Sequence, residues 1–335
     1  MKVGIIGPLS GEEDEGFRNV TARFVEHLGS RHDLLPLDVG GISSPLFWKK
    51  MRDFSPDVVH YMTAPTFSSF LALKAARALS KNDTKLVMSA LHPNCLPVLR
   101  NPVVRTLIPR FPPDLIVTQS PEAARLLKET GARVRLLPHG VDTVRFRPVP
   151  AGEKGRLREK YDLDREVSVL LHVGHVKPDR GLGQLLRLQQ TIPDCQVVIV
   201  GSPRFARDRK YAAYLREHGC IVMEGYYSRI EELYQLADCY VFPRGKTLFL
   251  PLTVMEAMAC NLPVVTAPFD GVMQFFPEGK GLFVARSGEE YSGYVRLALD
   301  GRVTVTTREK VLPCSWGRVA DEVSGMYQTL CGEKP

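Results

Sequence analysis

The sequence predicts an α/β protein built from two doubly wound, Rossmann-like domains. The chain has 335 residues, and chains beyond about 250–300 residues usually divide into more than one domain. Short apolar runs alternate with helical stretches along most of its length, as in parallel sheets that are covered on both faces. This alternation is interrupted once by a charged segment containing proline and glycine, and then begins again.

The first series of elements occupies residues 1–150. Its apolar runs are short and continuous, which is typical of strands buried on both faces. The expected strands are Val3–Ile6, Val58–Tyr61, Leu86–Met88, Leu115–Val117 and Val134–Leu137. The expected helices between them are Phe17–Leu28, Phe67–Leu79 and Pro121–Thr130. Residues 1–150 are therefore predicted to form the first domain.

The second series begins after the segment 147–166, whose composition is that of a linker. The expected strands here are Val167–Val173, Gln196–Val200, Cys220–Met223, Cys239–Phe242 and Pro263–Thr266. These elements predict a second domain over residues 151–315. Ligands of such sheets bind beyond the carboxyl ends of the strands, so we expect the two domains to face each other across a cleft.

Composition excludes several protein classes. No apolar run approaches the roughly 20 residues that cross a bilayer, and the segment Lys2–Gly7 is shorter than the apolar part of a signal peptide. We therefore expect a cytoplasmic protein. The seven cysteines are odd in number and lack metal-ligand spacing, which favours free buried thiols over disulfides or a zinc site.

The positive charge is concentrated in the first half of the chain. Residues 1–150 carry 20 Lys+Arg against 14 Asp+Glu, whereas residues 151–335 carry 24 against 23. The segment 95–112 contributes Arg100, Arg105 and Arg110 beside apolar pairs. A basic amphipathic segment suits an anionic membrane or lipid-linked acceptor. The alternative is an irregular surface segment, since Pro97, Pro102 and Pro109 interrupt any long helix there.

A candidate phosphate-binding loop follows the first strand of the second domain. The run VSVLLHVGHVKPDRGLGQLL passes from a buried strand through Gly174, His175, Lys177 and Arg180, and a helix is expected from about Gly181. Glycines allow the backbone to approach a ligand, and basic side chains form charge-assisted bonds to phosphate oxygens. This pattern alone is also compatible with an ordinary basic loop.

The motifs between 225 and 285 add a family resemblance. They are GYYSRIEELYQLADCYVFP, then EAMACNLPVVTAPFDGV and GKGLFV, in that order. With LPHGVDTVRFRP at 137–148, SPRFARD after VVIVG and the ending CSWGRVADEVSGMYQTL, they resemble the family 4 glycosyltransferases of the GT-B fold. The resemblance spans nearly the whole chain. It implies that residues 316–335 form a helix returning to the first, acceptor-binding domain.

The resemblance also implies roles for individual residues. Glu256, expected at the start of a helix, would bind the ribose hydroxyls of a nucleotide-sugar donor. His175 and Arg180 would contact the diphosphate, and Gly174, Lys177 and Gly271 would also bind the nucleotide-sugar donor. His92 would approach the transferred sugar, and His60 would also face the ligand, whereas His139 would support the hinge. The family transfers sugars with retention and without a metal or cofactor.

Several positions depart from the family pattern. Leu248 stands where the family carries the glutamate that reads the donor sugar, and Asn261 and Gln274 replace a usual glycine and glutamate. The resemblance still predicts transfer of a sugar from a nucleotide-sugar donor to an acceptor glycan, lipid or small molecule. A non-catalytic nucleotide- or partner-binding protein and a sugar-nucleotide epimerase remain alternatives. Nucleic-acid binding rests on charge alone and is not expected.

Overall fold

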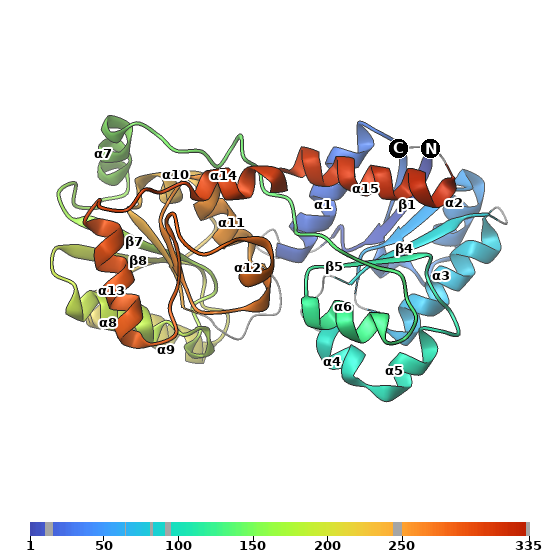
Figure 1. Cartoon of the computed structure of the whole chain (residues 1–335), viewed down its shortest axis with the longest axis horizontal. Helices are drawn as coiled ribbons and strands as arrows, with labels where there is room; N and C mark the ends of the chain where they lie inside the picture. Colours follow the sequence, from blue (N-terminus) through green and yellow to red (C-terminus); the bar gives the residue numbers. More distant parts are fainter. Residues whose placement is uncertain (11–15, 64, 81–82, 91–94, 244–249, 333–335) are drawn as a thin grey trace. The chain divides into compact units, whose positions relative to one another are not determined.

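The computed structural model describes residues 1–10, 16–63, 65–80, 83–90, 95–243 and 250–332. The chain divides into two compact units (Figure 1). The first unit combines Met1–Gly140 with Trp316–Pro335, and the second is Val141–Ser315. The division thus falls before residue 150, and residues 141–150 belong to the second unit.

The first unit is a six-stranded sheet in the order β2-β1-β3-β4-β5-β6, with every neighbouring pair parallel. Its strands are β1 (Lys2–Gly7), β2 (Asp33–Asp38), β3 (Val58–Tyr61), β4 (Lys85–Ser89), β5 (Leu115–Thr118) and β6 (Val134–Leu136). Its helices are α1 (Gly16–Gly29), α2 (Pro45–Phe54), α3 (Phe67–Leu79), α4 (Cys95–Arg100), α5 (Pro102–Leu107), α6 (Pro121–Lys128) and α15 (Trp316–Cys331).

The second unit is a six-stranded parallel sheet in the order β12-β11-β10-β7-β8-β9. Its strands are β7 (Ser168–Val173), β8 (Cys195–Val200), β9 (Ile221–Met223), β10 (Cys239–Phe242), β11 (Val264–Thr266) and β12 (Leu282–Val284). Its helices are α7 (Ala151–Lys160), α8 (Gly183–Thr191), α9 (Ala206–Glu217), α10 (Ile230–Leu236), α11 (Leu252–Ala259), α12 (Asp270–Phe275), α13 (Gly288–Leu299) and α14 (Thr307–Val311).

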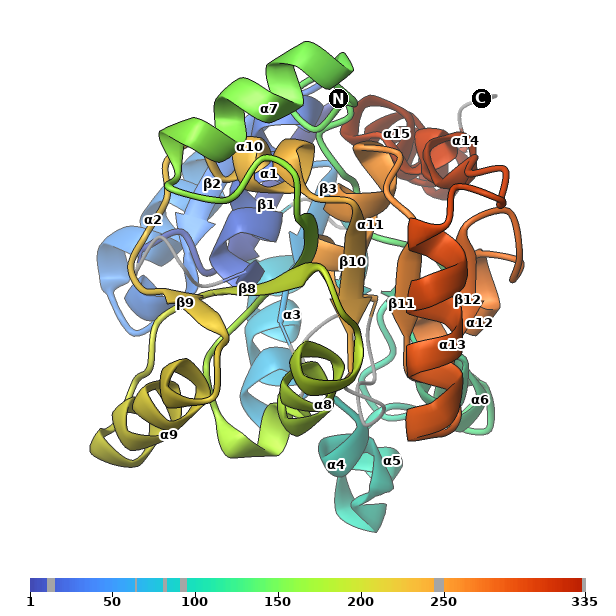
Figure 2. The same ribbon diagram turned by 90° about the vertical axis from the view of Figure 1, so that its left-hand side faces the viewer.

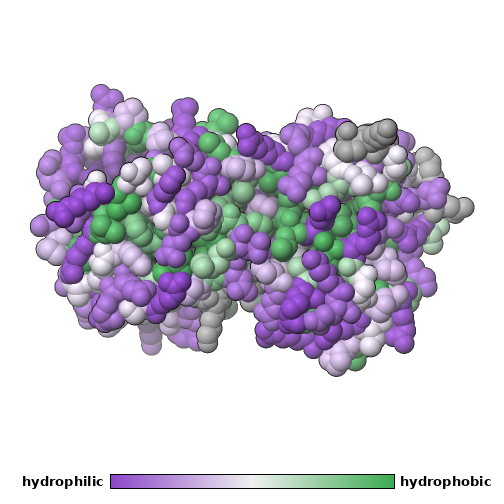
Figure 3. Space-filling view, viewed as in Figure 1, coloured by the Kyte–Doolittle hydropathy of each residue, from purple (hydrophilic) through white to green (hydrophobic). Residues whose placement is uncertain are grey.

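Two apolar cores hold this second sheet, one on each face. One core contains side chains of α10 and α11 together with Leu157 of α7. The other contains side chains of α8, α9 and α13. Figure 2 shows α7 and α10 on one side of the strands and α8, α9 and α13 on the other. Figure 3 shows hydrophilic residues spread over the outer face of both units, interrupted by apolar patches.

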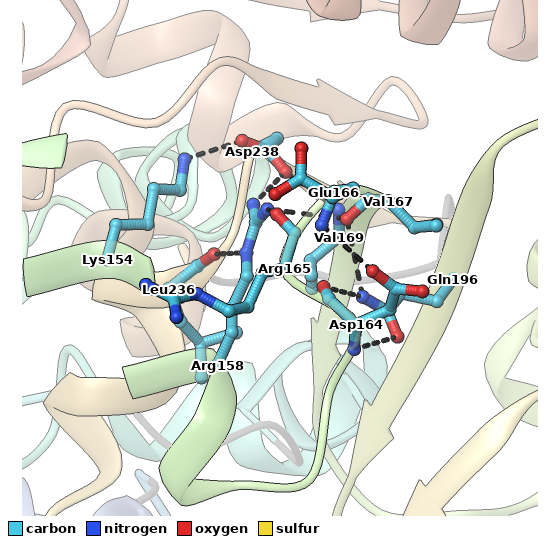
Figure 4. A network of polar contacts seen from close by, with 10 residues as sticks. All are labelled: Lys154, Arg158, Asp164, Arg165, Glu166, Val167, Val169, Gln196, Leu236 and Asp238. Atoms are coloured by element: carbon cyan, nitrogen blue, oxygen red, sulfur yellow. Dashed lines mark hydrogen bonds and ion pairs between the residues drawn. The ribbon is translucent and has the colours of Figure 1, made fainter. Parts of the chain in front are cut away.

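The expected linker at 147–166 is instead largely helix α7. Asp238, at the start of β10, binds two side chains of this helix (Figure 4). The Lys154 ammonium lies 2.6 Å from one Asp238 oxygen, and the buried Arg158 guanidinium donates to the other. The Asp238 carboxylate also accepts from the Val169 backbone N–H at 2.7 Å. Distant partners therefore hold in place a helix that its local composition does not indicate.

Candidate functional site

The loop between β7 and α8 lies where three strand ends meet. A side-chain carbon at Gly201, which follows β8, would come within 2.0 Å of the Gly174 carbonyl oxygen. Gly181 has a φ of 77°, and a side-chain carbon there would lie 2.8 Å from the Pro243 carbonyl oxygen. Only glycine tolerates approaches as close as these. The loops after β7, β8 and β10 are consequently packed backbone to backbone.

The three side chains of this loop that are expected to bind phosphate are all half-buried. His175 and Lys177 follow β7, and Arg180 ends a short 3₁₀ turn, Pro178–Arg180. Helix α8 then begins at Gly183, two residues later than the sequence suggests. The Lys177 ammonium lies 5.8 Å from the centre of the Phe205 ring. The loop thus places positive charge at the carboxyl edge of the sheet, where an anionic ligand can be bound.

His172 supports this loop and was not expected from the sequence. Its Nδ1 lies 2.9 Å from the Val241 carbonyl oxygen, so this nitrogen donates the hydrogen bond. Its ring stacks on Tyr240 with the ring centres 6.3 Å apart. Burial lowers the pKa of His172 to about 4, and the charge of the nearby Arg180 acts in the same direction. His172 is therefore neutral at pH 7 and joins β7 to β10.

Glu256 is the fifth residue of α11 and therefore lies one turn inside the helix, whereas the sequence placed it at the start. The residue before the helix is Pro251, which makes no side-chain cap. Glu256 therefore does not cap the helix. Its carboxylate oxygen accepts a hydrogen bond of 2.7 Å from the hydroxyl of Tyr234 on α10, whose side chain is buried. A half-buried carboxylate held in this way can accept hydrogen bonds from ligand hydroxyls.

Other acidic residues of the family-like block have a structural role. Glu232 on α10 accepts hydrogen bonds from Lys160 at 2.5 Å and from Tyr161 at 2.7 Å, and it also pairs with Arg229. Asp238 binds α7 and β7, as described above. Gly271 is buried in the first turn of α12, which follows β11. Of these positions, only Gly271 was expected to contact the ligand.

Two family models cover most of the chain. The model described as Glycosyl transferases group 1 matches residues 153–311, and that described as Glycosyltransferase Family 4 matches residues 3–145. The chain belongs to the family 4-like glycosyltransferases. Relatives and solved structures agree with this assignment.

The "Putative glycosyltransferase EpsD" of Bacillus subtilis (strain 168) is 27% identical over 83% of this chain and 78% of its own length. The "Alpha-galactosylglucosyldiacylglycerol synthase" of Streptococcus pneumoniae is 28% identical over 48% of this chain, a match that spans 42% of that relative's length. Anabaena HepE in complex with UDP-glucose has a TM-score of 0.74 at 16% identity, covering 98% of this chain and 100% of that chain. The glycosyltransferase therefore has the two-domain GT-B fold.

One histidine of the first unit of this glycosyltransferase, His60, lies differently from the expectation. His60 is fully buried within β3, where Nδ1 lies 2.5 Å from the Tyr327 hydroxyl of α15 and Nε2 lies 2.6 Å from Ser89 Oγ. The prediction that His60 faces a ligand is wrong, because both ring nitrogens have protein partners. His139 is buried next to Gly140. His92 lies outside the described residues, as does Leu248 of the second unit.

The basic segment of the first unit forms α4 and α5. Arg100 pairs with Glu122 at 2.7 Å and Arg105 with Glu129 at 2.9 Å, while Arg110 donates to the Thr106 carbonyl at 3.0 Å. Three apolar side chains of α4 are buried, those of Cys95, Leu96 and Leu99. The first two arginines are thus compensated by acidic residues of the glycosyltransferase itself, which weakens the positive field that a membrane would meet.

Metal and membrane features are not found in the described ranges. There, no three His, Cys, Asp or Glu side chains gather in a way that could hold a metal ion. Among the helices in these ranges, none combines the length and apolar character that a bilayer crossing needs. All seven cysteines are free, and Cys331 alone among them is half-exposed rather than buried.

Proposed function

We propose that this glycosyltransferase transfers a hexose from a nucleoside diphosphate sugar to an acceptor, with retention and without a metal ion or cofactor. One observation carries the proposal. The cationic loop of His175, Lys177 and Arg180 and the Glu256 carboxylate lie on elements that follow the adjacent strands β7 and β10. A nucleoside diphosphate offers both an anion for the cations and ribose hydroxyls for the carboxylate.

The proposed mechanism is positioning combined with stabilisation of the departing diphosphate. Arg180 and Lys177 would neutralise the charge that develops on the diphosphate as the bond to the sugar breaks. His175 would donate a hydrogen bond less reliably, since a histidine is neutral for much of the time near pH 7. Gly174 and Gly271 would let the backbone approach the ligand, and His92 would lie near the transferred sugar on the family resemblance.

The relatives support a choice of donor and acceptor to test. HepE binds UDP-glucose according to its description, so UDP-glucose is the first donor to test. The Streptococcus relative is a diacylglycerol glycolipid synthase by name, which supports a lipid-linked acceptor and peripheral contact with the cytoplasmic face of the membrane. Acceptor glycans and small molecules are the other acceptor classes to assay.

Titration calorimetry with UDP, UDP-glucose and uridine tests the donor site. Arg180→Ala should weaken UDP binding at least tenfold and leave uridine nearly unchanged, because a charge-assisted hydrogen bond contributes about 1.5–3 kcal/mol. Arg187→Ala is the matched control, since Arg187 lies on α8 and pairs with Glu289 at the surface. Equal losses for UDP and uridine in the Arg180 variant would show that its role is structural.

A non-catalytic nucleotide-binding protein is the second candidate, because Leu248 replaces the glutamate that reads the donor sugar in the family. Assays of UDP-glucose hydrolysis and transfer distinguish the two proposals. Binding without turnover would favour the second. A product that keeps the anomeric configuration of the donor, seen by NMR, would support the first.

A further inference from the structure

The chain from Ser202 to Lys210 carries a dense group of exposed cations. Arg204 lies in the loop after β8, and Arg207, Arg209 and Lys210 lie in the first turns of α9. We call these four residues the α9 cationic surface. The only acid within the segment is Asp208, whose side chain is fully buried. The surface therefore presents four positive charges and no exposed negative charge of its own.

Three of these four cations have no acidic partner in the described part of the chain, unlike most of its arginines. Arg207 lies 3.7 Å from the buried Asp208, with its own side chain 75% exposed. For Arg204, Arg209 and Lys210, no carboxylate lies within ion-pairing distance among the residues that the structure describes. By contrast, Arg100 and Arg105 each pair with a glutamate. Solvent-exposed charge without a partner is the kind that acts at a distance.

The position of these cations is also unfavourable for the helix itself. The first turn of a helix carries a partial positive charge, so cations placed there reduce helix stability. Helix α9 has a single acid in that turn, Asp208, which accepts from the Phe205 backbone N–H at 3.2 Å. Helix stability alone therefore does not account for cations at this end of α9.

The α9 cationic surface adjoins the proposed diphosphate loop. Strand β8 pairs with β7 so that Val200 lies beside Val173, and a side-chain carbon at Gly201 would lie only 2.0 Å from the Gly174 carbonyl oxygen. Lys177 of the diphosphate loop reaches the ring of Phe205, the residue directly after Arg204. On the other side, the Gly225 N–H donates to Ser202 Oγ at 3.2 Å. The loop that carries Arg204 and leads into α9 is thus held between the loops that follow β7 and β9.

We infer that the α9 cationic surface captures nucleoside diphosphates by long-range attraction and raises their rate of association with the neighbouring loop. This inference rests on the proposed function and deepens it. A charged patch beside a binding site raises the local concentration of oppositely charged ligand. Salt screens the effect over about 8–10 Å at physiological ionic strength. The surface acts on the approach of the ligand, whereas Arg180 and Glu256 hold the bound ligand.

Stopped-flow fluorescence with a UDP derivative that carries its fluorophore on the uracil ring, leaving the ribose hydroxyls free, tests the inference at low and high salt. The test variant is the triple change Arg207→Gln, Arg209→Gln and Lys210→Gln. At low salt its association rate constant should fall about tenfold, because electrostatic steering changes on-rates by about tenfold or more. Its dissociation rate constant should stay within about twofold of the parent. At high salt the two association rates should converge.

The triple change Arg100→Gln, Arg105→Gln and Arg110→Gln is the matched control. It removes the same formal charge from the first unit instead of from α9, and should leave the association rate nearly unchanged. Equal slowing in both variants would assign the effect to net charge and overturn the inference. An unchanged association rate in the α9 variant, with the parent still binding in an Arg180-dependent manner, overturns the capture role and leaves the proposed function intact. A parent that binds no nucleotide overturns both.

Discussion

The hydroxyl of Tyr234 fixes the carboxylate that we assign to the ribose, so Tyr234→Phe is an informative change. The substitution keeps the ring, which packs edge-on against Phe146 with the ring centres 5.5 Å apart. It removes the hydrogen bond of 2.7 Å to Glu256. Burial and the nearby Glu256 charge raise the pKa of Tyr234 well above its usual range, so the hydroxyl is protonated and donates.

The expected losses follow from what replaces the hydroxyl. Because the Glu256 carboxylate is half-buried, water can take part of the role, and the free energy of unfolding should fall by about 1 kcal/mol. Without the Tyr234 hydroxyl, the Glu256 side chain gains rotamer freedom that a ligand must remove on binding. Ordering one such side chain costs about 0.5–1.5 kcal/mol, so UDP affinity should fall roughly two- to tenfold.

Titration calorimetry with UDP and with inorganic pyrophosphate measures both sides of this prediction. Pyrophosphate has no ribose and should bind Tyr234→Phe as it binds the parent. Tyr161→Phe is a close control, because the Tyr161 hydroxyl also donates to a glutamate, Glu232, at 2.7 Å. It should lower stability without changing UDP affinity. Unchanged UDP binding in Tyr234→Phe, or an equal loss for pyrophosphate, would refute the positioning role.

Three further outcomes are expected. Asp238→Asn should lower the free energy of unfolding by about 3 kcal/mol in urea titrations, because Arg158 would stay buried without its counter-ion; a loss below about 1 kcal/mol would contradict this. Burial lowers the pKa of His60, His139 and His172 from the usual value of 6.5 to about 3, 3 and 4. These histidines stay neutral in the folded protein and gain protons on unfolding, so their contribution to the free energy of unfolding is complete above pH 6.5 and declines as the pH falls. Between pH 7 and pH 5 each should cost about 2 kcal/mol, and a flat stability profile over this range would refute the assignment. Flotation with anionic liposomes at low salt should show weak binding. This binding should fall only slightly when Arg100, Arg105 and Arg110 are changed to serine, since two of these arginines are already paired with glutamates. Complete loss of binding in this variant would show that the three arginines form the membrane contact.

Buried strands were predictable because parallel strands covered on both faces leave continuous apolar runs. The runs Val58–Tyr61 and Cys239–Phe242 coincide with β3 and β10. Strand β2 was not predicted, since it lies at the sheet edge, is largely half-exposed and contains Pro36. The edge strand β12, only three residues long, was not predicted either.

The site was predictable where the chemistry is local and unpredictable where it depends on distant partners. The loop from Gly174 to Arg180 is continuous in sequence, so its glycine and cations could be recognised together. The hydrogen bond between Tyr234 and Glu256 joins two residues that are 22 positions apart and lie on different helices. No spacing rule in the sequence indicates it. Helix α7 was interpreted as a linker for the same reason, because its anchor is Asp238.

The return of α15 to the first unit has a consequence for synthesis of the chain. The imidazole of His60 meets the Tyr327 hydroxyl across 267 residues of sequence, and ribosomes add about 5–20 residues per second. On the order of tens of seconds therefore pass between the appearance of β3 and that of its helical partner. During that interval the second unit can emerge and fold, while the first unit still lacks α15 and exposes the apolar surface that this helix covers. The domain that begins first is thus the one that finishes last, and a nascent chain halted before Trp316 would present this uncovered apolar surface to chaperones.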